Sequence, residues 1–293
     1  MRWEDGRESA NVEDRRAGGG FSMPGGRAGG VGIGTIAVAL VASLLFGVNP
    51  LTVIDMMGGG QPAVQAPVPA QAPVGQPGAS ADPAARFVSV VLASTEDTWQ
   101  AVFAQSGRQY QPPKLVLFSG RTPTACGTGS AASGPFYCPA DQRLYIDLRF
   151  YQVLRDRLGA PGDTAQAYVI AHEVGHHVQN LLGTMDQVHQ MRPRLSETQN
   201  NALSVRLELQ ADCYAGIWAN RSQQARGWLE SGDIEEALQA AAAVGDDTLQ
   251  QRSQGTVVPE SFTHGTSAQR ASWFRTGLQA GRVDACDTFA SRR

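Results

Sequence analysis

The sequence predicts an α+β fold that is mostly α, in which one folded body follows an N-terminal membrane helix and a linker. Three observations indicate this: an early stretch without charge, a stretch rich in Pro, Ala, Gly and Gln, and apolar residues at helical spacing over most of the remainder. The chain has 293 residues, of which 42% are apolar, so one sizeable core is possible. Its net charge of −3 and its lack of a basic block argue against nucleic acid as a partner.

The N-terminal part of the chain predicts a tail and a membrane-spanning helix. Residues 1–27 are polar and glycine-rich with interleaved charges, so we expect a disordered cytoplasmic tail. Residues 28–48 carry no charge and could cross a hydrocarbon core of about 30 Å as one helix. A buried core helix and a cleaved signal peptide are the alternatives. The stretch has almost no polar face, exceeds the usual signal-peptide length and precedes no clear cleavage site.

Basic residues set the expected orientation of this helix. Arginines precede the apolar stretch, whereas the next basic residue after it is Arg86. By the positive-inside rule we expect a single-pass protein of the cell membrane, with a cytoplasmic N-terminus and an extracytoplasmic body. Residues 49–83 have no periodic apolar face and predict a flexible linker. The body then occupies residues 84–293, with Asp82 as N-cap of its first helix.

The body predicts helices and a small sheet placed early. Short apolar runs predict strands at Lys114–Phe118 and Arg143–Leu148. Asp163 is the expected N-cap of a long, mostly apolar helix, and Gly183 ends it. Helical spacing of apolar residues predicts helices at 85–107, 150–158, 163–183, 201–222, 233–243 and 267–280.

Four cysteines, all in the body, predict two disulfides. An even number in an exported domain, without C-x-x-C spacing, favours disulfides over a structural zinc site. Four cysteines allow three connectivities. We favour Cys126 with Cys138, which closes a flexible Gly/Ser loop, and Cys213 with Cys286, which ties the C-terminal region to a helix. Four reduced, buried thiols are the alternative.

The stretch AYVIAHEVGHHVQNLLG, residues 167–183, holds three of the five histidines of the chain. His172 and His176 share one helix face, and Glu173 lies beside His172. This H-E-x-x-H spacing is typical of zincins, in which two imidazoles bind Zn²⁺ and the glutamate is the general base. A chance match on a solvated helix is the alternative. The flanking residues are apolar, however, and burying these side chains is unfavourable unless a metal satisfies them. We interpret His177 as a flanking residue that hydrogen-bonds locally.

A catalytic zinc site needs a third protein ligand and one open position. The motif does not continue into the metzincin pattern. Glu208 is the favoured third ligand, because RLELQADCYAG predicts an apolar helix on which Asp212 follows one turn later. Asp212 would accept the N–H of a zinc-bound histidine. His189 and Glu197 are the alternative ligands, and a solvated charged face is the alternative for the Glu208 and Asp212 pair.

HEVGHH and ELQADCYAG, together with GPFYCPADQRLYIDL, THGTSAQR and the opening MRWEDGRESANVEDRR, resemble the bacterial membrane-anchored neutral zinc metallopeptidase family. This family is a gluzincin-like group. The resemblance covers nearly the whole chain apart from the linker. It implies a zincin-like metallopeptidase domain that depends on one Zn²⁺ ion, and an edge strand, Arg143–Leu148, that pairs with an extended peptide. It does not supply a substrate.

The sequence therefore predicts a membrane-anchored zinc metalloendopeptidase that cleaves a peptide or protein substrate by means of a metal-activated water. Glu173 is the expected general base. His264 in FTHGTSAQR is the candidate donor to the oxyanion, with a role in the loop before a helix as its alternative. The rival function is a non-catalytic zincin-fold scaffold or adaptor on the outer side of the membrane. A zinc deaminase would need an H-x-E and P-C-x-x-C pair, which the sequence lacks.

Overall fold

A computed structural model describes residues 1–16 and 82–290. The predicted membrane helix at 28–48 and nearly all of the predicted linker lie outside these ranges. Among the helices that the structure describes, none combines the length and the apolar character that a bilayer crossing requires. The fold is an α+β arrangement dominated by helices, as the sequence predicts.

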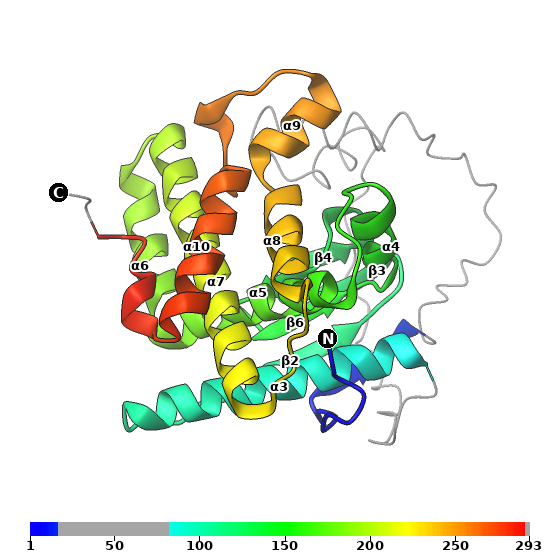
Figure 1. Cartoon of the computed structure of the whole chain (residues 1–293). Coiled ribbons are helices and arrows are strands. Elements are labelled where there is room, and N and C mark those ends of the chain that lie inside the picture. Colours follow the sequence, from blue (N-terminus) through cyan, green and yellow to red (C-terminus); the bar gives the residue numbers. More distant parts are fainter. Residues whose placement is uncertain (17–81, 291–293) are drawn as a thin grey trace, which may run out of the picture. The chain divides into compact units, whose positions relative to one another are not determined.

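The described part of the chain contains a four-stranded sheet with the order β1-β2-β6-β5 (Figure 1). β1 and β6 run parallel to β2, whereas β5 runs antiparallel to β6. A separate antiparallel pair, β3 and β4, follows β2 in the chain. The strands are β1 (Val12–Asp14), β2 (Lys114–Leu117), β3 (Arg121–Thr124), β4 (Gly127–Ser130), β5 (Phe136–Cys138) and β6 (Arg143–Ile146).

Both faces of this sheet are covered, which explains the continuous apolar runs of its two central strands. Leu115 and Leu117 of β2 point into the main core, to which α3, α5 and α7 also contribute. Val116 and Tyr145 point the other way, into a small second cluster with Cys138. The alternation follows directly from the two-residue repeat of a β-strand.

Helices supply most of the main core. α5, α7, α8 and α10 pack together, and α3 packs on α5 and α7. In Figure 1, α7 and α10 run side by side, next to α8. The helices are α3 (Pro83–Gln105), α4 (Arg149–Asp156), α5 (Asp163–Leu182), α6 (Thr184–Met191), α7 (Glu197–Arg226), α8 (Asp233–Ala243), α9 (Asp246–Gln254) and α10 (Ser267–Ala280).

Residues 1–16, predicted as part of a disordered tail, are instead packed on the body. β1 pairs with β2 in parallel, and the segment lies along α3 in Figure 1. Arg7 forms an ion pair with Glu96 at 3.0 Å, and Ser9 and Asn11 also hydrogen-bond the Glu96 carboxylate. The prediction is wrong for these residues because their polar side chains satisfy a buried carboxylate of α3 that composition does not reveal.

The predicted N-cap of α5 is wrong, whereas its predicted C-terminal end is confirmed. Gly162 is the N-cap, and Asp163 is the first helical residue. The Asp163 side chain accepts hydrogen bonds from the Met1 ammonium at 3.0 and 3.1 Å, so it does not cap the helix. Gly183 ends the helix in the left-handed conformation, with φ of 80°, as the sequence predicts. At α3, Asp82 is the N-cap and accepts from the Ala84 N–H, also as predicted.

Strand β6, expected at the sheet edge, lies between β2 and β5. The edge on that side is β5, a three-residue strand that was not predicted. The run of apolar residues in β6 is the signal of an interior strand, because both of its faces and both of its backbone edges are covered.

Candidate metal centre

The centre forms where α5 crosses α7, and Gly175 permits the close approach of these helices. A Cβ atom at position 175 would lie 2.9 Å from the Ala211 carbonyl oxygen. Gly175 stands inside the H-E-x-x-H motif, and Ala211 lies between Glu208 and Asp212 on α7. The missing side chain therefore lets two polar stretches on two apolar helices meet.

Two imidazoles and one carboxylate converge at this crossing. His172 Nε2 lies 3.2 Å from Glu208 Oε2, and His176 Nε2 lies 3.4 Å from Glu208 Oε1. These three residues offer ligand atoms within 4.8 Å of one another, and all are buried or nearly so. The alternative ligands lie elsewhere on the surface, His189 on α6 and Glu197 at the start of α7. The structure thus brings together the three ligands that spacing favours.

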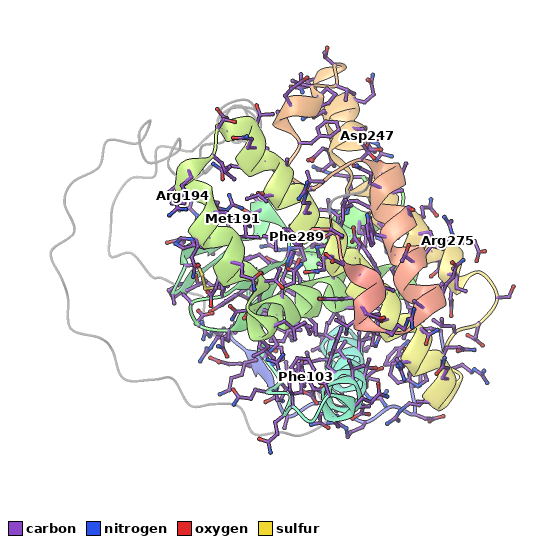
Figure 2. All side chains as sticks on the ribbon, turned by 90° about the vertical axis from the view of Figure 1, so that its left-hand side faces the viewer. Phe103, Met191, Arg194, Asp247, Arg275 and Phe289 are labelled. Atoms are coloured by element: carbon purple, nitrogen blue, oxygen red, sulfur yellow. A yellow bond between two sulfur atoms is a disulfide. The ribbon has the colours of Figure 1, made fainter. Side chains whose placement is uncertain are left out.

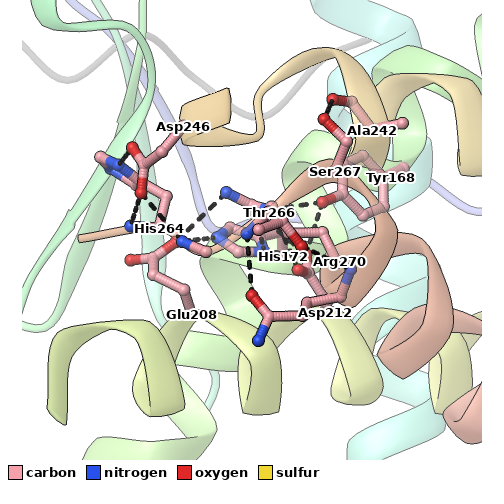
Figure 3. Close-up of polar contacts among 12 residues, drawn as sticks. Tyr168, His172, Glu208, Asp212, Ala242, Asp246, His264, Thr266, Ser267 and Arg270 are labelled. Atoms are coloured by element: carbon pink, nitrogen blue, oxygen red, sulfur yellow. Dashed lines mark hydrogen bonds and ion pairs between the residues drawn. The ribbon is translucent and has the colours of Figure 1, made fainter. Parts of the chain in front are cut away.

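The Nδ1 atoms of both imidazoles are engaged on the side away from Glu208. His172 Nδ1 lies 2.8 Å from Asp212 Oδ1, which is the contact expected for Asp212 (Figure 3). His176 Nδ1 lies 2.9 Å from Gln179 Oε1. The Gln179 amide N–H₂ donates to the Leu207 carbonyl and to the Gln210 side chain, so its oxygen faces His176. Each Nδ1 then carries a proton, which leaves both Nε2 lone pairs for a metal.

Asp212 is fully buried and has three side-chain partners. It accepts from His172, from the Tyr168 hydroxyl at 2.5 Å, and from Arg270 Nε and Nη2 at 3.0 Å each. Figure 3 shows these side chains grouped around the Asp212 carboxylate. Sequence reasoning missed Tyr168, Gln179 and Arg270. Of these three, only Tyr168 could have been found from the sequence, because it lies four residues before His172 on the same face of α5.

Opposing effects set the pKa values in this cluster. Burial raises the pKa of Asp212, but the charges of Arg270 and His172 outweigh this, and the pKa lies below its ordinary value. Burial lowers the pKa of His172, but the Asp212 carboxylate raises it to about 10. Burial also raises the pKa of Glu208, and the two neighbouring imidazoles bring it well below its ordinary value. The cluster is therefore strongly polarised, with ionised carboxylates on either side of His172.

Glu173 lies beside this cluster with an unengaged carboxylate. Its exposed fraction is 8%, and burial raises its pKa above the ordinary value in spite of the nearby imidazoles. No residue in the described ranges hydrogen-bonds its side chain. A carboxylate with a raised pKa and free lone pairs is a better proton acceptor than an ordinary one.

His264 reaches the centre from the loop before α10, and its side chain is 47% exposed. Asp246 holds this loop, because its Oδ2 accepts the backbone N–H groups of Thr263, His264 and Gly265. His264 Nδ1 lies 3.1 Å from Asp246 Oδ1. Burial lowers the pKa of His264, but this hydrogen bond and the charge of Glu208 raise it overall. Figure 3 shows His264 on the Glu208 side of the cluster.

His177, the third histidine of the motif, faces away from the ligands and joins α5 to the sheet. Its Nε2 donates to the Gln111 carbonyl at 2.7 Å, and its Nδ1 accepts from the Tyr137 hydroxyl of β5 at 3.0 Å. Burial lowers its pKa to about 4, so the ring is neutral at pH 7. His177 therefore has a hydrogen-bonding role, as the sequence predicts, but its partners are distant in sequence and not local.

Both favoured disulfides are present. Cys126 pairs with Cys138, and Cys213 pairs with Cys286, with Cα–Cα distances of 5.9 and 5.7 Å. Cys213 directly follows Asp212, so the second disulfide ties the C-terminal region to the part of α7 that carries the site. Gln210 reinforces this link by donating to the Cys286 carbonyl at 3.0 Å.

Comparisons with known proteins agree with this geometry. Residues 1–289 match the family described as "Putative neutral zinc metallopeptidase". The protein YpfJ of Escherichia coli K12 is 50% identical over 297 residues, covering 99% of each chain. Mb2605 of Mycobacterium bovis and Rv2575 of Mycobacterium tuberculosis H37Rv are each 44% identical over 216 residues, covering 70% of this chain and 72% of theirs. All three are described as uncharacterized. No solved structure matches the chain.

Proposed function

The chain belongs to the neutral zinc metallopeptidase family, and from this premise we propose that it is a zinc-dependent metalloendopeptidase acting on peptides or proteins. One observation carries the proposal. His172 Nε2, His176 Nε2 and the Glu208 carboxylate converge, with the unengaged Glu173 carboxylate beside them. Two histidines and one glutamate are one of the ligand sets of catalytic zinc sites, which keep one position open.

The donors fit a single Zn²⁺ ion. Both imidazoles have their Nδ1 atoms hydrogen-bonded, so the unprotonated Nε2 atoms are the ligands. Glu208 would supply a carboxylate oxygen in place of its present contacts with the two rings. A bound zinc ion supplies a Lewis acid that activates water and polarises a carbonyl group.

Glu173 would be the general base. Its carboxylate takes the proton of the attacking water and passes it to the leaving amine nitrogen when the peptide bond breaks. Burial supports this role, because it raises the pKa of Glu173 and so makes the carboxylate a better proton acceptor.

His264 would donate a hydrogen bond to the oxyanion. Asp246 fixes the imidazole through Nδ1, so Nε2 is the free donor. The raised pKa of His264 favours the imidazolium form, which stabilises negative charge that develops on the carbonyl oxygen. Its half-exposed position suits contact with a substrate.

An extended peptide would pair with β5, the edge strand next to the helix of the ligands. The Tyr137 hydroxyl connects β5 to His177 at 3.0 Å and accepts from Asn180 at 3.0 Å. These contacts hold the strand against α5, where main-chain hydrogen bonds can align a substrate with the centre.

Location and membrane contact stay predictions. Residues 28–48 would contact the lipid bilayer, and the body would be extracytoplasmic. Two disulfides support an oxidising compartment for the body. The rival function, a non-catalytic scaffold that keeps the fold and the metal, gives no role to Glu173.

Metal content and proteolysis of the full chain test the proposal. We expect about one zinc ion per chain and chelator-sensitive cleavage of casein, restored by added zinc. Glu173→Gln should retain zinc and lose at least 100-fold in cleavage, because it removes the base but no ligand. Glu197→Gln, at an exposed position, is the control and should cleave normally. Full activity of Glu173→Gln would exclude Glu173 as the base, and zinc-loaded protein that cleaves nothing would favour the scaffold.

A further inference from the structure

α10 lies unusually close to α7 because glycines face each other at their contact. A Cβ atom at Gly277 would lie 1.8 Å from the Cys213 carbonyl oxygen, and one at Gly216 would lie 2.1 Å from the Phe274 carbonyl oxygen. No side chain larger than hydrogen fits at either position. This approach brings Arg270, two turns before Gly277, to the level of Asp212.

Arg270 is nearly fully buried, with 3% of its side chain exposed, and it contacts several side chains of the cluster. Nε and Nη2 bind the two Asp212 oxygens at 3.0 Å each. Nη2 also donates to the Tyr168 hydroxyl at 3.2 Å. Nη1 lies 3.6 Å from Glu208 Oε2. One guanidinium therefore contacts a predicted metal ligand and the carboxylate that orients another ligand.

The balance of charge gives this contact a consequence for metal binding. Glu173, Glu208 and Asp212 supply three carboxylates, and Arg270 supplies one buried cation. Three carboxylates and one guanidinium leave an excess of acidic side chains, which a divalent ion would offset. Without Arg270, the Asp212 carboxylate would lose its bidentate partner and could turn away from His172.

We propose that Arg270 is a positioning residue that sets the metal affinity of the centre by fixing Asp212 and restraining Glu208. The inference rests on the metal site of the proposed function and is independent of peptide cleavage. Arg270 would not touch substrate, because its side chain is buried behind His172. Lys cannot reproduce the planar two-point contact, so Arg270→Lys should restore the charge and only part of the affinity.

Zinc affinity of the full chain, measured by competition with a chromophoric chelator, tests this role. Arg270→Met should weaken zinc binding about 10-fold to 100-fold, as loss of an outer partner of a ligand typically does. Arg270→Lys should fall between this variant and the parent chain. The visible absorption of the Co²⁺-substituted protein should change in both variants, because the ligand geometry changes. Arg275→Met on the exposed face of α10 (Figure 2) is the matched control and should change neither.

A double-mutant cycle separates positioning from a general effect on the fold. If Arg270 acts through Asp212, Arg270→Met should add little to the loss of affinity caused by Asp212→Asn. Additive losses, or a folded Arg270→Met with parental affinity and cobalt spectrum, would overturn the inference. If Arg270→Met does not fold, Arg270→Lys decides by the same two readouts. A parent chain that binds no zinc would instead overturn the proposed function.

Discussion

Two of the clusters that contain buried carboxylates compensate them differently. At the candidate metal centre, Arg270 contacts Asp212 and Glu208, and Glu173 has no hydrogen-bond partner among the described residues. On α3, the buried Glu96 binds Arg7, together with hydroxyl and amide donors from the N-terminal segment, residues 1–16.

The difference shows which cluster needs an external cation. Within the described ranges, the N-terminal segment supplies all the partners of the Glu96 carboxylate, so that cluster attaches this segment to α3. At the candidate metal centre, both Nε2 atoms face only the Glu208 carboxylate, and Glu173 has no hydrogen-bond partner among the described residues, which favours a bound cation there. Buried acids alone therefore do not identify a binding site. The local balance of donors and charge does.

Substitution of Glu208 gives the largest effect that this comparison predicts. Glu208→Ala removes a metal ligand and should lower zinc affinity by more than the roughly 100-fold loss typical of an outer partner. Chelator competition measures the loss. Glu96→Ala, the corresponding change in the other cluster, should leave zinc affinity within about 3-fold of the parent. Equal losses in both variants would show that the two clusters are not independent.

Substitution of Glu96 should act on stability. Glu96→Ala leaves Arg7, Ser9 and Asn11 without their shared acceptor and should lower the free energy of unfolding by about 2–3 kcal/mol. The loss in the free energy of unfolding should not be larger, because Arg7 is half-exposed and its ion pair is screened by water. Denaturant unfolding of the zinc-free protein measures the change. Asp156→Ala, at an exposed acid, provides the control, and an unchanged midpoint for Glu96→Ala would contradict the prediction.

The smallest predicted effect concerns pH. Burial lowers the pKa of the Met1 ammonium, but hydrogen bonds and charge from Asp163, with Asp233, raise it overall above its ordinary 8.0. Glu230, at 3.5 Å, and Glu236 also face this group. The stabilisation is complete below pH 8 and is lost as pH rises through the raised pKa. Unfolding midpoints should therefore decline above pH 8, and Asp163→Asn should flatten that decline. A parallel decline in both proteins would exclude the ammonium as its source.

Sequence reasoning found the residues that converge at the candidate site because a helix repeats locally. His172, Glu173 and His176 lie within one turn and a half, and Glu208 with Asp212 repeats the same spacing. Arg270 and Gln179 could not be assigned, because their roles depend on how α10 and α7 approach α5. That approach depends on glycines whose neighbours are remote in sequence.

The sheet was only half predictable, for a related reason. β2 and β6 are apolar runs covered on both faces, and such runs are visible in sequence. β3 and β4 are short and include Pro or Gly, which are depleted in strands, and β5 is only three residues long. β1 is one valine followed by two acidic residues, and its partner strand lies about a hundred positions later, so nothing local indicates a strand.

Because β1 pairs with β2, the two chain segments that carry these strands must lie on the same side of a bilayer. The chain leaves the body after Arg16 and rejoins it at Asp82, and these two residues form an ion pair. A polypeptide that departs from and returns to one folded unit traverses a bilayer an even number of times. A single traverse by residues 28–48 would place β1 and Met1 opposite β2 and Asp163, so the predicted cytoplasmic N-terminus and the predicted exported body do not both agree with this pairing. If the pairing forms in the cell, an impermeant label should reach residues 1–16 and residues 82–290 together or reach neither.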